Sequence, residues 1–140
     1  YKNPTICNEE NLYAVSELLQ KAEIVCGDFA QCLDYADNES FIYFDPPYRP
    51  ISATASFTSY SKDIFDDQEQ KRLRKVYGEL DKKDACVMLS NSDPKNVNPN
   101  DNFFDDLYRG YHIERLNATR LINCNAERRG VITEILVVNY

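Results

Sequence analysis

A short strand-forming run, Phe41 to Phe44, stops at two consecutive prolines, and this junction constrains the fold more than any other feature of the sequence. The segment after the run is Asp-Pro-Pro-Tyr at 45–48. Proline fixes φ and lacks a backbone donor, so two prolines in succession end a regular strand ladder. The residue before a proline is also held extended. We therefore expect a stiff loop that presents the Asp45 carboxylate, the Pro46 carbonyl and the Tyr48 ring.

Two acceptors beside an aromatic platform suit a flat ring that carries an exocyclic amine. A plain turn at the end of a strand is the alternative, because proline pairs are common in loops. The residues at 45–48 alone leave both interpretations open.

Hydrophobic periodicity along the rest of the chain places helices between strands. We expect helices over 9–20, 29–35, 66–80 and 102–109, strands over 22–26, 41–44, 85–89, 111–116 and 131–138, and long loops over 49–63 and 117–130. This alternation predicts an α/β fold with a mainly parallel sheet and helices on both faces. The last two strands have no helix between them, so we expect them to form an antiparallel pair at the carboxyl-terminal edge.

Polar residues follow three of the predicted strands directly, at 27–29, 45–48 and 90–93. Ligands of open α/β sheets bind at the carboxyl ends of the strands. We therefore expect a binding rim, and it contains Asp28, Asp45, Tyr48 and Asn91.

The charge distribution narrows the choice of partners. The 140 residues carry 16 basic and 23 acidic side chains, a net charge of −7, which argues against general affinity for nucleic acid. Residues 1–70 hold most of the excess negative charge. A DNA-binding face therefore has to come from the second half, where Arg115, Arg120, Arg128 and Arg129 lie. Scattered, solvated surface charge is the alternative.

The cysteine and histidine content argues against a metal site. The five cysteines include no CxxC pair, and the single histidine, His112, lies in a strand-like run and is expected to be partly buried or at the surface. We expect reduced thiols rather than a disulfide framework. Apolar runs are strand-sized and no secretory signal begins at Tyr1, so we also expect no membrane segment and a cytoplasmic location.

The hexapeptide Tyr-Phe-Asp-Pro-Pro-Tyr at 43–48 resembles the catalytic motif of Dam-like DNA adenine-specific amino-methyltransferases, which use S-adenosyl-L-methionine. Further segments resemble this family in the same order along the chain. They are 1–6, 26–29, 57–68, 89–92, 120–123, 128–130, Glu134 and 139–140.

The resemblance implies a Rossmann-like methyltransferase sheet and a reaction on an adenine flipped out of double-stranded DNA, as expected of bacterial or phage enzymes of restriction-modification or related DNA methylation systems. The implied catalytic residues are Asp45, Pro46 and Tyr48, and the implied cofactor-binding residues are Asp28, Phe29 and Asp45. The implied DNA-binding residues are Tyr60, Lys62, Arg120, Arg128 and Arg129. A helix cap and a core aromatic are the alternative roles for Asp28 and Phe29.

One departure from the family is decisive for the expected domain organisation. The glycine-rich cofactor loop, Phe-x-Gly-x-Gly, is absent from these 140 residues. We therefore expect 1–8 to be the tail of a target-recognition region and 9–140 to be the C-terminal half of the catalytic domain. The upstream half of the same polypeptide is then the expected partner, and the 140 residues alone are expected to be inactive. A non-catalytic DNA-binding or partner-binding module and a cytosine-N4 methyltransferase are the alternatives.

Overall fold

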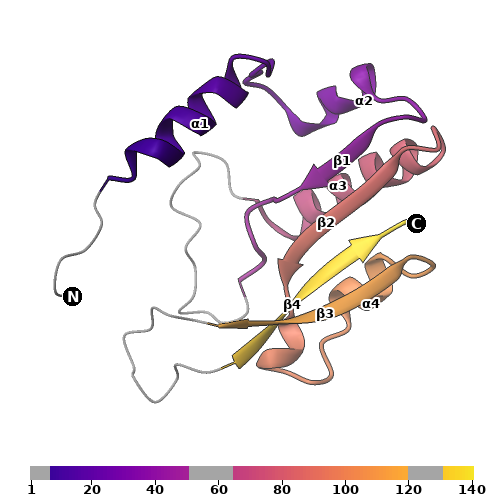
Figure 1. The fold of residues 1–140 in the computed structure, drawn as a ribbon. Helices are drawn as coiled ribbons and strands as arrows, with labels where there is room; N and C mark the ends of the chain where they lie inside the picture. The colour runs from indigo at the N-terminus through magenta and orange to yellow at the C-terminus, as the bar shows by residue number, and fades with distance from the viewer. Residues whose placement is uncertain (1–6, 51–64, 120–130) are drawn as a thin grey trace, which may run out of the picture.

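The computed structural model describes residues 7–50, 65–119 and 131–140. Their elements follow the order shown in Figure 1. These are α1 (Glu9–Leu19), η1 (Phe29–Gln31), α2 (Cys32–Tyr35), β1 (Phe41–Phe44), α3 (Asp67–Asp81), β2 (Cys86–Ser92), η3 (Pro94–Asn96), α4 (Phe103–Leu107), β3 (His112–Thr119) and β4 (Val131–Val138). Every predicted helix and four of the five predicted strands are present, with ends shifted by a few residues.

The four strands form one sheet in the order β1-β2-β4-β3. β1 and β2 are parallel, whereas β4 runs antiparallel to both of its neighbours. The α/β class and the antiparallel pair at the carboxyl-terminal edge are confirmed. The predicted mainly parallel sheet is corrected to a mixed one, because β4 lies between β2 and β3 and so creates two antiparallel pairs.

The strand predicted over 22–26 is not formed. Ile24 and Val25 lie in irregular chain and are 78% and 55% exposed. A strand needs a neighbour that pairs its backbone donors and acceptors. None of the four strands in the described part of the chain pairs with this segment, so its strand-like sequence is left without a partner.

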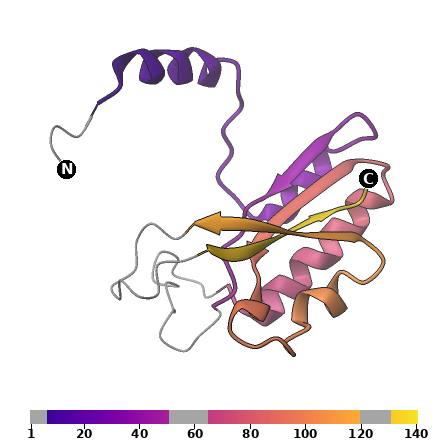
Figure 2. The same ribbon diagram turned by 60° about the horizontal axis from the view of Figure 1, so that its bottom comes forward.

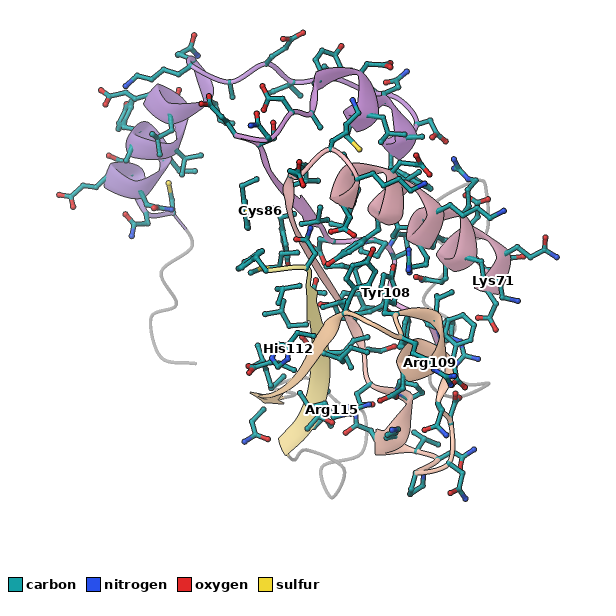
Figure 3. The ribbon with its side chains drawn as sticks, turned by 90° about the vertical axis from the view of Figure 1, so that its right-hand side faces the viewer. Lys71, Cys86, Tyr108, Arg109, His112 and Arg115 are labelled. Carbon is teal, nitrogen blue, oxygen red and sulfur yellow. The ribbon has the colours of Figure 1, made fainter. Side chains whose placement is uncertain are left out.

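Helix α3 supplies most of the helical side of the core. It begins at the N-cap Asp66, whose carboxylate accepts hydrogen bonds from the backbone N–H groups of Gln68 and Glu69. Its apolar stripe packs on the sheet together with α4, and the buried residues of this core are Leu73, Val76, Tyr77 and Leu80 of α3, Val87 and Leu89 of β2, Phe104 of α4 with Tyr108 just after it, and Ile135 and Val137 of β4. Figure 3 shows Tyr108 between α3 and the sheet.

The opposite face of the sheet is open. Phe41 and Tyr43 of β1 are 59% and 52% exposed, and Cys86 of β2 is exposed beside them. Figure 3 shows Cys86 on the side of the sheet away from α3. Helices α3 and α4 lie on the same face (Figure 2), which corrects the prediction of helices on both faces for the part of the fold that is described.

Helix α1 lies apart from the sheet in both ribbon views (Figures 1 and 2). It begins as predicted after Asn8, whose Oδ1 accepts a hydrogen bond from the Asn11 N–H. Its apolar stripe is exposed along the whole helix, and α1 buries none of its residues. The exposed stripe consists of Leu12, Val15, Leu18 and Leu19.

Candidate active site

The carboxyl ends of β1 and β2 lie side by side, because the two strands are parallel. β1 leads directly into the 45–48 segment, and β2 ends at Ser90, Asn91 and Ser92. Each of these three β2 residues contacts the loop that follows β1. The structure therefore brings together three of the four residues predicted for the rim: Asp45, Tyr48 and Asn91.

Asp45 is exposed at this rim and is oriented by a hydroxyl group. Its Oδ1 accepts a hydrogen bond of 3.2 Å from Ser90 Oγ, which also lies 2.8 Å from the Tyr43 hydroxyl. No ion pair to Asp45 is formed by the residues that the structure describes. The carboxylate has oxygen lone pairs available for a ligand.

Tyr48 is half-buried next to Asp45, and its hydroxyl donates to Glu134 Oε2 of β4 at 3.5 Å. Burial raises the pKa of the Tyr48 phenol above its usual range, and the negative charges of Glu134 and Asp45 act in the same direction. Tyr48 is therefore a neutral phenol at physiological pH. It therefore presents an uncharged aromatic ring at the rim.

The backbone carbonyls of this loop are used unequally. The Pro47 carbonyl accepts a hydrogen bond from Gln70 Nε2, and the Arg49 carbonyl accepts one from Ser92 Oγ. The Pro46 carbonyl accepts none from the described residues. It therefore stays available as an acceptor next to the Asp45 carboxylate.

Arg49 fixes the far end of the loop. Its guanidinium makes two hydrogen bonds to the Asp67 carboxylate, at 2.7 and 3.2 Å, and a third to Asp101 at 3.0 Å. The same group lies 4.3 Å from the centroid of the Phe103 ring. A bidentate ion pair of this kind restricts orientation as well as distance, so the loop is tied to the start of α3 and to the segment before α4.

Asp28 directly precedes η1 as its N-cap. Its carboxylate is bound by Arg72 of α3 rather than by residues of the 45–48 loop. Its carboxylate accepts hydrogen bonds from Arg72 Nη1 and Nη2 and from the Ala30 N–H. These contacts lower the pKa of Asp28 to about 2, and the hydrogen bonds from Arg72 have the largest effect. The Arg72 guanidinium also covers one face of the Phe29 ring, 4.0 Å from its centroid. Both alternative roles are therefore present: Asp28 caps η1, and Phe29 packs against the core.

A hollow of about 430 Å³ adjoins this pair, which is within the range of small-molecule sites. It is lined by Glu23, Val25, Gly27, Asp28, Phe29, Gln31, Cys32 and Tyr35. A carboxylate has about four acceptor sites, and the contacts described above use three of those on Asp28. One remains for an amino group, so these residues fit an adenine ring such as that of S-adenosyl-L-methionine.

Comparison with known families places the chain in a family. The model of the D12 class N6 adenine-specific DNA methyltransferases matches residues 1–122. The chain belongs to this family.

Curated relatives of this D12-class chain include enzymes from archaea, bacteria and a phage. The type II methyltransferase M.MjaIII of Methanocaldococcus jannaschii is 50% identical over 141 residues, which cover 100% of this chain and 47% of that protein. M1.LlaDCHI of Lactococcus lactis is 40% identical, over 100% of the chain and 48% of the relative. The DNA adenine methylase of Escherichia coli K12 is 30% identical, over 99% and 47%. The chain thus spans about half the length of these relatives.

The predicted DNA-binding residues of this D12-class chain lie outside the described residues: Tyr60, Lys62, Arg120, Arg128 and Arg129. Residues 1–6 of the predicted recognition tail lie outside them too. Arg115 is described, and it is engaged within the fold. Its guanidinium binds the buried Asp93 and the Asp105 carboxylate, so it joins β3 to the end of β2 and to α4.

Two features are absent from residues 7–50, 65–119 and 131–140. Within these ranges no cluster of three or more metal-ligating side chains occurs. No helix in them has the length and apolar character needed to cross a bilayer. His112 (labelled in Figure 3) is exposed, and its Nε2 lies 3.3 Å from Glu114 Oε1.

Sequence reasoning missed several residues of the D12-class site, above all Ser90, Gln70 and Arg72. Gln70 gave a readable signal, because it occupies the apolar stripe of α3 three residues before Leu73 and seven before Tyr77. A polar side chain in such a stripe is buried and needs partners. Arg72 gave none, because its contact with Asp28 joins segments 44 residues apart.

Proposed function

We propose that this chain is the catalytic half of a DNA adenine-N6 methyltransferase that takes its methyl group from S-adenosyl-L-methionine. The observation that carries the proposal is the pair of open acceptors at the rim. The Asp45 carboxylate is oriented without an ion pair, and the Pro46 carbonyl accepts no hydrogen bond from the described residues. An exocyclic amine has two hydrogens, and two adjacent acceptors match them.

The chain's own residues act on a base that has left the duplex, because an adenine inside the helix cannot reach the rim. Tyr48 stacks on the flipped ring. Asp45 and Pro46 accept the two amino hydrogens, which draws the nitrogen lone pair out of conjugation with the ring. S-adenosyl-L-methionine, when bound, supplies an electrophilic methyl group on a sulfonium. Asp45 then takes the proton that the amine loses and passes it to water.

The adenine moiety of the cofactor belongs in the hollow beside Asp28 and Phe29. The remaining acceptor site of Asp28 receives the adenine amino group, and Phe29, which lines the same hollow, contacts the adenine ring. Arg72 keeps the carboxylate ionised and oriented for this contact. Neither Asp28 nor Phe29 contacts the reacting atoms, so their effect is on binding.

A companion half completes the enzyme in this proposal. Phe41 and Tyr43 of β1 are more than half exposed, and the apolar stripe of α1 is exposed along the whole helix. The segment at 22–26 pairs with none of the described strands. Among the described strands, β1 lies at an edge of the sheet and pairs on one side only. We infer that the upstream half of the same polypeptide covers these surfaces. It acts with this chain on double-stranded DNA in the cytoplasm.

The test joins residues 1–140 to the part of the archaeal relative that lies outside the match. Unmethylated double-stranded DNA is incubated with labelled S-adenosyl-L-methionine, and the modified nucleoside is identified by mass spectrometry. We expect N6-methyladenine. Asp45→Ala should reduce turnover by at least about 10²-fold while cofactor binding measured by calorimetry persists. Asp106→Ala, an exposed carboxylate on α4, is the matched control and should retain full turnover.

Other outcomes would favour an alternative function or reject the role of Asp45. N4-methylcytosine as the product would favour the cytosine-specific alternative. DNA binding without any methyl transfer by the unaltered protein would favour the non-catalytic module. Near-normal turnover by Asp45→Ala would reject the role of Asp45.

A further inference from the structure

We propose that Gln70, Asn91 and Ser92 are positioning residues that clamp the backbone on both sides of Tyr48. Gln70 Nε2 donates to the Pro47 carbonyl at 3.2 Å, before Tyr48. Asn91 Oδ1 accepts from the Arg49 N–H at 2.9 Å, and Ser92 Oγ donates to the Arg49 carbonyl at 2.6 Å, after it. This inference rests on the proposed function, because it assigns a purpose to the loop at 45–48.

Burial makes the clamp rigid. Gln70 and Asn91 are both 0% exposed, and they are joined to each other by a hydrogen bond of 3.3 Å from Asn91 Nδ2 to Gln70 Oε1. Ser92 is also buried. Buried amides without access to water must keep their partners, because an unsatisfied group carries its full desolvation cost. The loop, α3 and β2 are therefore connected by one closed polar network.

The clamp also selects which carbonyl a ligand can use. Of the carbonyls at 46, 47 and 49, it occupies the last two and leaves the Pro46 oxygen without a hydrogen bond from the described residues. Tyr48 lies between the clamped groups, so its backbone cannot rotate to turn the ring away. The network thus holds the Pro46 carbonyl, the Asp45 carboxylate and the Tyr48 ring in a fixed arrangement.

A residue that acts only through positioning affects the rate of the chemical step more than ground-state binding. A misplacement of 1 Å caused by a change far from the chemistry costs about 10²-fold in rate. A loss of kcat at unchanged KM indicates an interaction that matters only in the transition state. General damage to the fold would instead lower both binding and the active fraction.

The experiment uses the enzyme completed with its companion half. Gln70→Met keeps the length of the side chain and removes the amide, and Gln68→Met makes the same change at an exposed position of α3. We expect Gln70→Met to lower kcat by about 10- to 100-fold and to leave KM for S-adenosyl-L-methionine within about threefold. Gln68→Met should match the unaltered enzyme. Ser92→Ala, which removes one clamp contact without adding volume, should lower kcat by a smaller factor.

A second readout does not depend on activity. In the 140-residue chain, amide hydrogen exchange at Arg49 measured by NMR should accelerate at least about 10-fold in Gln70→Met, because the network that holds its acceptor is opened. Unchanged kcat in both Gln70→Met and Ser92→Ala, or a rise in KM with kcat unchanged, would overturn the inference. If Gln70→Met fails to fold, the kcat of Ser92→Ala decides. Absence of methyl transfer by the unaltered enzyme rejects the proposed function instead, and exchange at Arg49 then still decides whether the clamp exists.

Discussion

Arg72 of α3 grips the Asp28 carboxylate with two parallel hydrogen bonds, of 3.0 and 2.7 Å, and at the same time covers the Phe29 ring. One guanidinium thus orients two of the three residues that the family resemblance assigns to the cofactor, Asp28 and Phe29. The pair is at the surface, so its main effect is on ionisation and orientation rather than on overall stability.

The first prediction concerns the titration of Asp28. Its pKa of about 2 lies below its usual 3.8, chiefly because of the Arg72 hydrogen bonds. A depressed carboxyl pKa stabilises the folded state above the unfolded pKa, and this contribution is lost as the pH falls from about 4 through 2. Arg72→Met should therefore raise the Asp28 midpoint towards 3.8, as followed by NMR of the carboxyl carbon. Lys71→Met, which removes a neighbouring charge that makes no contact with Asp28, should leave the midpoint in place.

The second prediction separates the ring of Tyr48 from its hydroxyl. The hydroxyl contact to Glu134 is long, at 3.5 Å, whereas the proposed role is stacking. Tyr48→Phe should keep kcat/KM within about fivefold, and Tyr48→Ala should lose about 10- to 100-fold, since base stacking contributes about 1–3 kcal/mol. Steady-state methyl transfer by the completed enzyme measures both. Equal losses in the two variants would mean that the hydroxyl carries the effect.

The residues of the rim could be predicted because their signals are local. Two prolines end a strand wherever it lies, so the position of Asp45 and Tyr48 follows from adjacent residues. Contacts between distant segments left no such signal. The insertion of β4 between β2 and β3, which makes the sheet mixed, depends on pairings of residues more than 40 positions apart, such as Met88 with Val138.

The segment at 22–26 shows that a strand-like sequence pattern does not by itself determine whether a strand forms. Its residues have strand propensity, but a strand exists only when another strand pairs with it. The same reasoning explains Cys86. Its apolar neighbours suggest burial, yet it is exposed because one face of the sheet is uncovered in the described structure.

The third prediction uses Cys86 as a probe of that open face. In the 140-residue chain, Cys7, Cys26 and Cys86 are exposed and should react with iodoacetamide rapidly. Cys32 should react slowly, because burial raises the pKa of its thiol and reduces the thiolate that reacts. In the enzyme completed with its companion half, alkylation of Cys86 should slow by at least about 10-fold, as quantified by peptide mass spectrometry. Equal reactivity of Cys86 in both proteins would place the companion half elsewhere.

The last prediction compares two tyrosines of the core. Tyr77 and Tyr108 are both fully buried and meet edge to face, with ring centroids 5.4 Å apart. The Tyr77 hydroxyl donates to the Val87 carbonyl at 3.1 Å, whereas the Tyr108 hydroxyl has no partner among the described residues. Burial raises the pKa of both phenols well above the usual range, so both stay neutral.

The same substitution should therefore have different effects at the two positions. Tyr77→Phe removes a satisfied hydrogen bond and should lower the free energy of unfolding by about 1 kcal/mol. Tyr108→Phe removes a buried hydroxyl that forms no hydrogen bond with the described residues. It should leave the free energy of unfolding unchanged or raise it by up to about 1 kcal/mol. Urea unfolding of the 140-residue chain measures both, with unchanged m-values as the check that the unfolded states are comparable. A loss at Tyr108 equal to that at Tyr77 would mean that the Tyr108 hydroxyl has a partner beyond the described residues.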